Sequence, residues 1–297
     1  MPHDRWTYEG RLLARPGEEV VDQGLGFDLQ TLVSRRQILR AFGLGVTALG
    51  VAACDAGSGS SASTSGTAGT AATAGEIPDE TAGPFPGDGS NGPNVLAQSG
   101  ILRSDIRSSF GTASGTARGV PMTLELTITD MANGNAPFAG TAVYVWHCDR
   151  EGRYSLYSDG AQDQNYLRGV QIADSSGRVR FTSIVPACYS GRWPHVHFEV
   201  YPDRAGITDA TNAIATSQVA LPENVCRTVY AQPGYETSAG NLSRVSLRSD
   251  NVFGDDGGVH QLGTVTGDVS GGYTVALAVP VDTRTAPTGG GVPGRGR

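Results

Sequence analysis

The alternation of apolar and polar side chains over short segments constrains the fold of this chain more than any other feature. Residues Met122–Thr129 alternate without a break. Because successive side chains of a β-strand point to opposite faces of a sheet, this period of two is typical of a half-buried strand. Further strands are predicted at Thr141–Trp146, Arg178–Phe181, His195–Val200 and Tyr273–Val279. A weak amphipathic pattern over residues 205–216 is the one candidate helix.

Turn-forming residues separate these strands and complete the fold prediction. The 297 residues include 42 glycines and 16 prolines, and pairs such as Asn133-Gly134 and Ser176-Gly177 are typical turn signals. We therefore predict an all-β fold, an antiparallel β-sandwich with long functional loops. A net charge of −7 argues against a nucleic-acid partner, because phosphate binding requires a basic face.

The N-terminal region resembles an export signal rather than part of the fold. Ser34–Arg40 contains an arginine pair followed by an uncharged run, Ala41–Ala53. As a helix this run would span roughly 20 Å, less than the ~30 Å hydrocarbon core of a membrane. It ends in Val51-Ala-Ala-Cys54, which resembles a bacterial lipoprotein cleavage box, so Cys54 is the predicted lipidation site. Simple cleavage near Ala53 and release of a secreted protein is the alternative.

Composition divides the chain into four parts. Residues 1–54 form the predicted twin-arginine, lipoprotein-type signal segment, and residues 55–76 are rich in Gly, Ser, Ala and Thr, which is typical of a flexible linker. Residues 77–283 contain the predicted β-sandwich domain. Residues 284–297 are predicted to be a disordered C-terminal tail.

Two histidines are the first candidates for metal binding. His195 and His197 stand two apart in a predicted strand, so their side chains project from one face about 7 Å apart along the backbone. Such a pair can bind one ion. The alternative is a polar strand edge that faces solvent.

The sequence before these histidines contains further motifs. The run Phe181–Phe198 contains Pro186-Ala-Cys-Tyr189, then Arg192-Trp-Pro-His195-Val-His197. Upstream lie Trp146-His-Cys-Asp-Arg-Glu-Gly-Arg-Tyr154-Ser and Glu80-Thr-Ala-Gly-Pro-Phe85. In content and order these segments resemble the intradiol ring-cleavage dioxygenases, the family of the catechol and protocatechuate dioxygenases.

The resemblance implies a non-haem Fe³⁺ cofactor with four protein ligands: Tyr154, Tyr189, His195 and His197. It also implies catalytic roles for Arg192, whose guanidinium stabilises developing negative charge, and for Tyr189, which takes up a proton. Phenolates and neutral imidazoles suit ferric iron and leave room for a bidentate substrate.

Alternatives remain for individual residues at this stage. Tyr154 can be a cross-strand aromatic, with Tyr157 as the competing ligand, and Arg192 can form a salt bridge to Glu199. Five residues separate Tyr189 from His195, fewer than in well-studied catechol-cleaving members of the family. The shorter segment suggests a more open pocket or a different catechol.

Three cysteines remain once Cys54 is set aside. In an exported protein a disulfide is plausible, and we favour Cys188 with Cys226, with Cys148–Cys188 as the alternative. His147 stands next to the first tyrosine motif and is expected to be structural or to line the pocket.

The resemblance implies an intradiol dioxygenase that inserts O₂ into a catechol-type aromatic diol and yields a muconate-type diacid. The expected partners are this small aromatic diol, O₂ and a membrane reached through the lipid anchor, with a homo-oligomer left open. The expected location is the extracytoplasmic side of the cell membrane, or secretion. The rival reading is a non-catalytic extracytoplasmic β-sandwich lipoprotein that binds a metal or another ligand.

Overall fold

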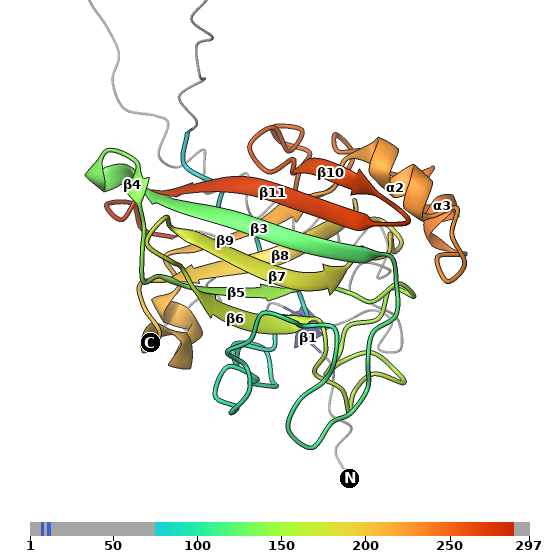
Figure 1. Ribbon diagram of the computed structural model, residues 1–297, viewed down its shortest axis with the longest axis horizontal. Coiled ribbons are helices and arrows are strands. Elements are labelled where there is room, and N and C mark those ends of the chain that lie inside the picture. The colour runs from blue at the N-terminus through green and yellow to red at the C-terminus, as the bar shows by residue number, and fades with distance from the viewer. Residues whose placement is uncertain (1–6, 9–10, 13–74, 288–297) are drawn as a thin grey trace, which may run out of the picture. The chain divides into compact units, whose positions relative to one another are not determined.

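The computed structural model describes residues 7–8, 11–12 and 75–287 (Figure 1). The chain divides into two compact units, Met1–Ala74 and Gly75–Arg297. The first contains a two-stranded antiparallel ribbon of β1 (Thr7–Tyr8) and β2 (Arg11–Leu12). The predicted arginine-pair signal, the lipidation site Cys54 and residues 55–74 of the predicted linker lie outside the described residues.

Two sheets make up the second unit (Figure 1). The first has the strand order β6-β5-β8-β9, and all its pairs are antiparallel. The second has the order β10-β11-β3-β4, with β7 also paired to β3. The strands are β3 (Pro121–Asp130), β4 (Ala136–Pro137), β5 (Ala142–Trp146), β6 (Arg168–Ile172), β7 (Arg178–Ile184), β8 (His195–Tyr201), β9 (Ala215–Ala220), β10 (Thr264–Asp268) and β11 (Gly272–Val281).

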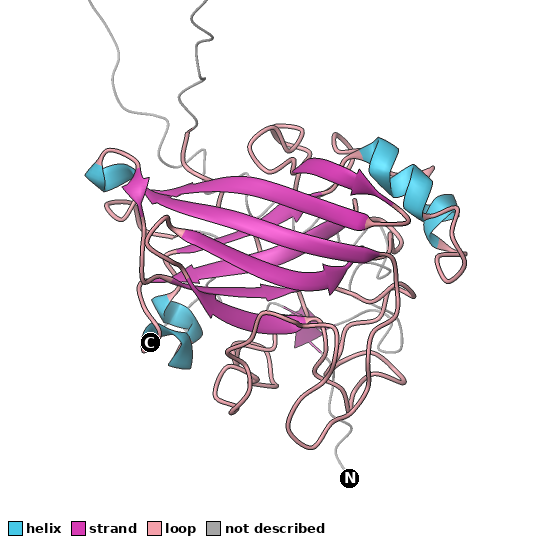
Figure 2. Cartoon of the chain, in the orientation of Figure 1, coloured by secondary structure: helices cyan, strands magenta, loops and turns pink. Residues whose placement is uncertain are grey.

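The predicted β-sandwich is confirmed, with one correction to its topology. Strands dominate the fold and the helical segments lie at its periphery (Figure 2). However, β11 runs parallel to β3 over nine residue pairs, from Tyr273–Met122 to Val281–Asp130. The second sheet is therefore mixed: β11 follows β10 in an antiparallel hairpin and runs parallel to β3.

The helix predicted around residues 205–216 is wrong. Two 3₁₀ turns, η3 (Gly206–Thr208) and η4 (Ala210–Asn212), precede β9 instead. The Asp209 carboxylate accepts the backbone N–H of Thr211 and starts η4, a local bond that competes with a continuous helix. Elsewhere in the described residues lie the 3₁₀ turn η2 (Met131–Asn133) and two short helices, α2 (Glu223–Val229) and α3 (Ser238–Leu242).

No helix among the described residues is long and apolar enough to cross a membrane.

Strand β8 is buried on both faces, and this positions the candidate site. On its inner face Val196, Phe198 and Val200 join the core between the two sheets, opposite β3 residues such as Leu126. On its other face the two histidines are covered by loops that belong to a second cluster, which includes Trp146. Both faces of β8 are buried, so its apolar residues alternate with buried histidines rather than with exposed polar residues.

The predicted Cys188–Cys226 disulfide is absent. Cys148, Cys188 and Cys226 are buried and form no disulfide. The Cys188 thiol lies 3.4 Å from the Arg192 carbonyl oxygen and donates to it, and the Cys148 thiol lies 3.8 Å from that of Ala187. Burial raises the pKa of the Cys188 thiol to about 12, which keeps it protonated and unreactive at neutral pH.

The turn between β6 and β7 provides a test of the fold. Gly177 has φ +72°, and a Cβ there would overlap the carbonyl oxygen of Ile128. Gly177→Ala should lower the free energy of unfolding by roughly 3 kcal/mol, more than the 1–2 kcal/mol of left-handed backbone strain alone. Gly134 has a similar φ, +66°, with no atom near its Cβ position, so Gly134→Ala is the matched control and should show the strain alone. Urea denaturation measures both; equal losses would contradict the described packing at Gly177.

Candidate metal centre

Four side chains bring one donor atom each to a common point. The Nε2 atoms of His195 and His197 lie 3.0 Å apart. The Tyr189 hydroxyl lies 3.3 Å from His195 Nε2, and the Tyr154 hydroxyl lies 3.5 Å from the same atom. The two hydroxyls are 3.4 Å apart. The structure thus brings together the four residues predicted as metal ligands.

These donors are buried, which decides against a solvent-facing strand edge. His195 and His197 are 2% and 3% exposed, Tyr154 is 2% exposed, and Tyr189 is partly exposed. Tyr189 therefore marks the side of the centre that is open to an incoming molecule.

The tyrosines come from loops, and a buried carboxylate shapes the first of them. Tyr154 lies in the segment between β5 and β6, just after a turn at Gly152, whose φ is +88°. Asp149 Oδ1 accepts the backbone N–H groups of Glu151 and Arg153, and this bonding closes the turn. Tyr157, the competing candidate, lies elsewhere: its hydroxyl accepts the backbone N–H of Gly87 at 2.9 Å.

Hydrogen bonding and stacking orient the imidazoles. His195 Nδ1 donates to the Trp193 carbonyl at 2.6 Å, so its Nε2 carries the lone pair that a metal needs. The His197 ring stacks on Trp146 at 4.8 Å with an interplanar angle of 7°. Gly83 approaches the other side of this ring, where an added Cβ would lie 3.4 Å from His197 Cε1.

Burial keeps Tyr154, His195 and His197 neutral in the absence of a bound cation. Burial, with the positive charge of Arg192 as the next cause, lowers the pKa of His195 to about 3. Burial and His195 hold the pKa of His197 well below its usual range. Burial and Tyr189 raise the pKa of Tyr154 well above its ordinary value. Neutral imidazole is the form that binds metals, and a bound trication would favour the phenolate form of tyrosine.

The donor set and its spacing fit a transition metal. Ligand bonds of about 2.1 Å with angles between 90° and 110° place neighbouring donors about 3.0–3.4 Å apart. The observed separations of 3.0–3.5 Å match this range. Within the described ranges, no group of three or more His, Cys, Asp and Glu side chains is arranged to hold a metal ion. The fit therefore depends on the two tyrosines, and two oxygen and two nitrogen donors suit ferric iron.

Arg192 is the charged group beside this centre, and its partner differs from the one considered in the sequence. It is 5% exposed, and its Nε donates to Asp250 Oδ2 at 3.0 Å. Its Nη2 donates to Gln218 Oε1 at 2.6 Å. Glu199 instead accepts the Tyr201 hydroxyl, so the alternative salt bridge to Glu199 is wrong. Burial by itself would lower the pKa of Arg192, but Tyr189 and Asp250 raise it above its ordinary value.

Asp250 and Gln218 are residues that the sequence did not identify. Gln218 lies on β9 directly opposite His197 in the register of the sheet. A strand prediction extended to Ala215–Ala220 would have indicated which face of the sheet Gln218 occupies. Asp250 lies in an irregular segment after α3, where no periodicity predicts a position.

A second arginine holds the covering loops in place. Arg168 is 1% exposed and donates five hydrogen bonds to uncharged oxygens. The acceptors are the carbonyl oxygens of Phe85, Pro86 and Ser155, and the hydroxyls of Ser155 and Tyr144. These bonds connect the segment around residue 85 to the loop that carries Tyr154.

His147 has a structural role, the first of the two roles expected for it. Its Nδ1 donates to the Cys148 carbonyl at 2.8 Å, and its Nε2 accepts the Ser183 hydroxyl at 2.7 Å.

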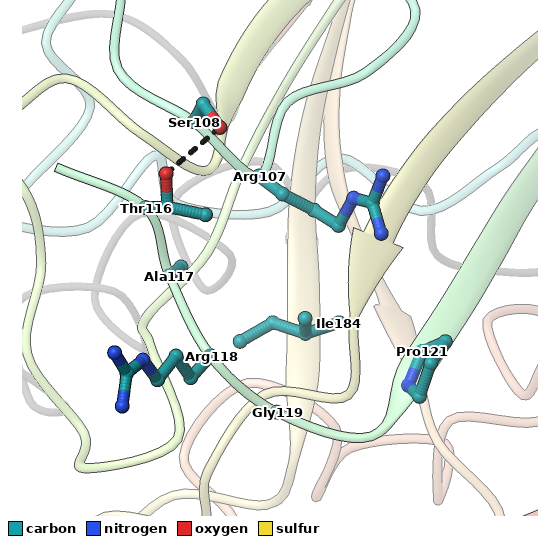
Figure 3. Close-up of a pocket in the computed structure, with 8 residues that line it drawn as sticks. All are labelled: Arg107, Ser108, Thr116, Ala117, Arg118, Gly119, Pro121 and Ile184. Atoms are coloured by element: carbon teal, nitrogen blue, oxygen red, sulfur yellow. Dashed lines mark hydrogen bonds between the residues drawn. The ribbon is translucent and has the colours of Figure 1, made fainter. Parts of the chain in front are cut away.

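Two cavities lie apart from the four donors. One of about 400 Å³ is lined by residues 107–108, 116–119, Pro121 and Ile184 (Figure 3). In this view the side chains of Arg107 and Arg118 extend toward opposite sides, and Arg107 pairs with Asp105. The other, of about 740 Å³, lies between Trp193, α2 and residues 242–248. None of the four donor residues lines either cavity.

The segment that carries the four donors is similar in sequence to known proteins. Residues 91–205, which include all four donors, match the Dioxygenase family. Over 53 residues the chain is 38% identical to the chlorocatechol 1,2-dioxygenase of Rhodococcus opacus and 40% identical to the catechol 1,2-dioxygenase of Pseudomonas sp. (strain EST1001). These matches cover 18% of this chain and 21% and 17% of those relatives, about a fifth of their length.

Solved structures show the same fold. The intradiol ring-cleavage dioxygenase of Tetranychus urticae superposes with a TM-score of 0.56 at 21% identity, covering 70% of this chain and 95% of that chain. A second dioxygenase structure gives a TM-score of 0.58 at 19% identity, covering 73% and 98%.

The burial of His147 predicts how stability depends on pH. Burial lowers its pKa to about 4, below the value of about 6.5 in an unfolded chain. Between these values only the unfolded state binds the proton, so stability falls as the pH drops below 6.5. In the metal-free chain at pH 5 this residue costs about 2 kcal/mol relative to pH 7. In urea denaturation, His147→Gln should reduce the loss of stability between pH 7 and pH 5 by that amount. Replacement of the exposed His260 by Gln should leave this loss unchanged. The same pH dependence of stability in wild type and His147→Gln would contradict the prediction.

Removal of the Arg168 guanidinium tests the anchoring of the loops. Arg168→Met removes five hydrogen bonds from buried oxygen acceptors and should cost at least about 3 kcal/mol of stability. Arg178 is exposed on β7, so Arg178→Met should change stability by less than about 0.5 kcal/mol. Thermal unfolding of both variants decides the matter, and a small effect of Arg168→Met would show that the loops are held by other contacts.

Proposed function

We propose that this chain, in which residues 91–205 match the Dioxygenase family and the fold is that of intradiol ring-cleavage dioxygenases, is a non-haem Fe³⁺-dependent intradiol dioxygenase of catechol-type diols. The observation that carries the proposal is the convergence of two tyrosine oxygens and two histidine nitrogens: His195 Nε2 lies 3.0–3.5 Å from the other three donor atoms, and the two tyrosine oxygens are 3.4 Å apart. Tyr154, Tyr189, His195 and His197 would hold the iron. When bound, the iron supplies a Lewis acid for both oxygens of the diol and makes the ring reactive toward O₂.

The overall reaction needs no other reactant. A catechol and one O₂ molecule give a diacid: the bond between the two hydroxyl-bearing carbons breaks, and each carbon gains one oxygen atom. The ring carbons are oxidised and O₂ is reduced, so neither an external reductant nor a nucleotide cofactor is required.

The protein side chains handle protons and charge. Tyr189, the partly exposed donor, can accept a proton from a diol hydroxyl at its phenolic oxygen as the diol enters. The buried guanidinium of Arg192 stabilises negative charge that develops on the ring, and it does so in surroundings from which water is excluded. Phe253, fully buried, lies 6.5 Å from the His195 ring and contributes to this exclusion.

A non-catalytic metal-binding protein is the second candidate function. Its supporting observation is the low exposure of the His195 and His197 pair. Zinc in this site would leave the protein colourless, whereas tyrosinate bound to ferric iron absorbs visible light.

The visible spectrum and oxygen consumption test the proposed function. The iron-loaded chain should be coloured and should consume one O₂ per catechol cleaved. Tyr189→Phe should shift or bleach the colour and reduce kcat/KM by at least about 100-fold. The matched control is Tyr157→Phe, which removes a nearby hydroxyl that bonds Gly87 instead of facing the donors. A colourless protein that consumes no oxygen with any catechol would eliminate the proposal.

We further propose that residues 1–54 direct export and that Cys54 anchors the mature chain through acyl groups. The sequence Val51-Ala-Ala-Cys54 supports this proposal, because two or more acyl chains suffice for stable membrane attachment. The wild-type chain expressed in a bacterium should fractionate with membranes, and Cys54→Ala should be released. Equal fractionation of the two would exclude a lipid anchor at this residue.

A further inference from the structure

One buried carboxylate connects the charged group of the candidate site to a part of the chain outside the family match. Asp250 is 2% exposed and lies beyond residues 91–205. Its Oδ2 accepts Arg192 Nε at 3.0 Å and the backbone N–H of Trp193 at 2.6 Å. Its Oδ1 accepts the backbone N–H groups of Val252 and Phe253. All four bonds hold the carboxylate in one orientation.

The same carboxylate holds the Arg192 guanidinium in one orientation. Asp250 fixes the Nε side and Gln218 fixes Nη2, and Gln218 in turn donates to the Thr81 carbonyl. Among the described residues no hydrogen bond involves Nη1, so this nitrogen is left for a ligand. A guanidinium held by two partners at fixed positions loses little further freedom when it meets a substrate.

Asp250 also reaches the metal donors through the main chain. It accepts the N–H of Trp193, and the carbonyl of the same residue accepts His195 Nδ1–H. The residue that fixes the tautomer of His195 is thus itself held by Asp250.

We propose that Asp250 is a positioning residue for Arg192, one that fixes the direction from which the guanidinium meets the substrate. This inference rests on the proposed function. Asp250 touches neither substrate nor reacting atoms; it acts through Arg192. Its negative charge compensates the buried guanidinium, and its geometry selects one orientation of that group.

Kinetics of the iron-loaded full-length chain test the positioning role. Asp250→Asn preserves the shape of the side chain but removes the charge and two of the four oxygen lone-pair acceptors. It should lower kcat/KM for a catechol about 10- to 100-fold while the visible band is retained. In an Arg192→Gln background the same change should cost less than about twofold, because the group that it positions is gone. Multiplicative losses in the double variant would overturn the proposal.

Two further variants separate positioning from charge balance and from general stability. Asp250→Glu keeps the charge but displaces the carboxylate by one methylene, so a positioning role predicts a loss of kcat/KM and a charge-balancing role predicts none. If Asp250→Asn does not fold, the kinetics of Asp250→Glu still test the proposal. The control is Asp130→Asn: Asp130 is a buried carboxylate that caps η2 through Oδ1, an acceptor that Asn keeps, so this replacement should leave kcat/KM unchanged.

A readout without turnover separates this proposal from the proposed function. In the metal-free chain the Arg192 Nε–H should give a slowly exchanging signal in arginine side-chain NMR, assigned by its loss in Arg192→Gln. Asp250→Asn should speed its exchange at least 10-fold; unchanged exchange would overturn the positioning role even in an active enzyme. A protected signal in a wild-type chain that cleaves no catechol would refute the proposed function and leave the anchoring of Arg192 established.

Discussion

The approach of two imidazole nitrogens to 3.0 Å is the constraint on which the candidate site depends. Two nitrogens can remain this close in a buried space only if both rings are neutral or a cation lies between them. The pairing of β8 with β5 places His197 opposite Trp146, and the stacked ring fixes its plane. With the tyrosine hydroxyls added, four polar atoms face one another in a largely buried space. A metal ion that binds all four stabilises the folded chain over the unfolded one.

The sheet and the loops each supply part of the site. The sheet supplies the histidines, whose separation is fixed by strand geometry. Irregular segments supply Tyr154, Tyr189 and the orientation of Arg192. These segments are held by buried polar residues rather than by regular structure: Asp149 closes one turn, and Asp250 holds another segment. Such anchors are effective because an unpaired polar group in a buried place is costly.

The sequence predicted what short-range periodicity and local motifs encode. Alternation identified β3, β5, β7, β8 and β11 within a few residues of their bounds, and it missed β4, β6, β9 and β10. It could not identify the parallel pairing of β11 with β3, because a parallel and an antiparallel neighbour require the same side-chain pattern. The helix expected near residue 205 failed because the capping bond of Asp209 favours short turns.

The same limit applies to the site. Motif order predicted the four donors that the structure brings together, but it missed Asp250, which lies 58 residues from its partner Arg192 in an irregular segment. The disulfide prediction also failed, since cysteine count carries no information about the direction of each thiol, and the Cys188 thiol donates to a backbone carbonyl. Contacts of long sequence separation depend on packing that no local pattern records.

Resonance Raman spectroscopy of the iron-loaded chain, excited within its visible band, tests the central claim most directly. Vibrations of tyrosinate bound to iron should appear in the wild-type spectrum, should weaken in Tyr154→Phe and Tyr189→Phe, and should persist in Tyr157→Phe. A spectrum without tyrosinate vibrations, or one that these ligand substitutions leave unchanged, would contradict a ferric centre built from these four side chains.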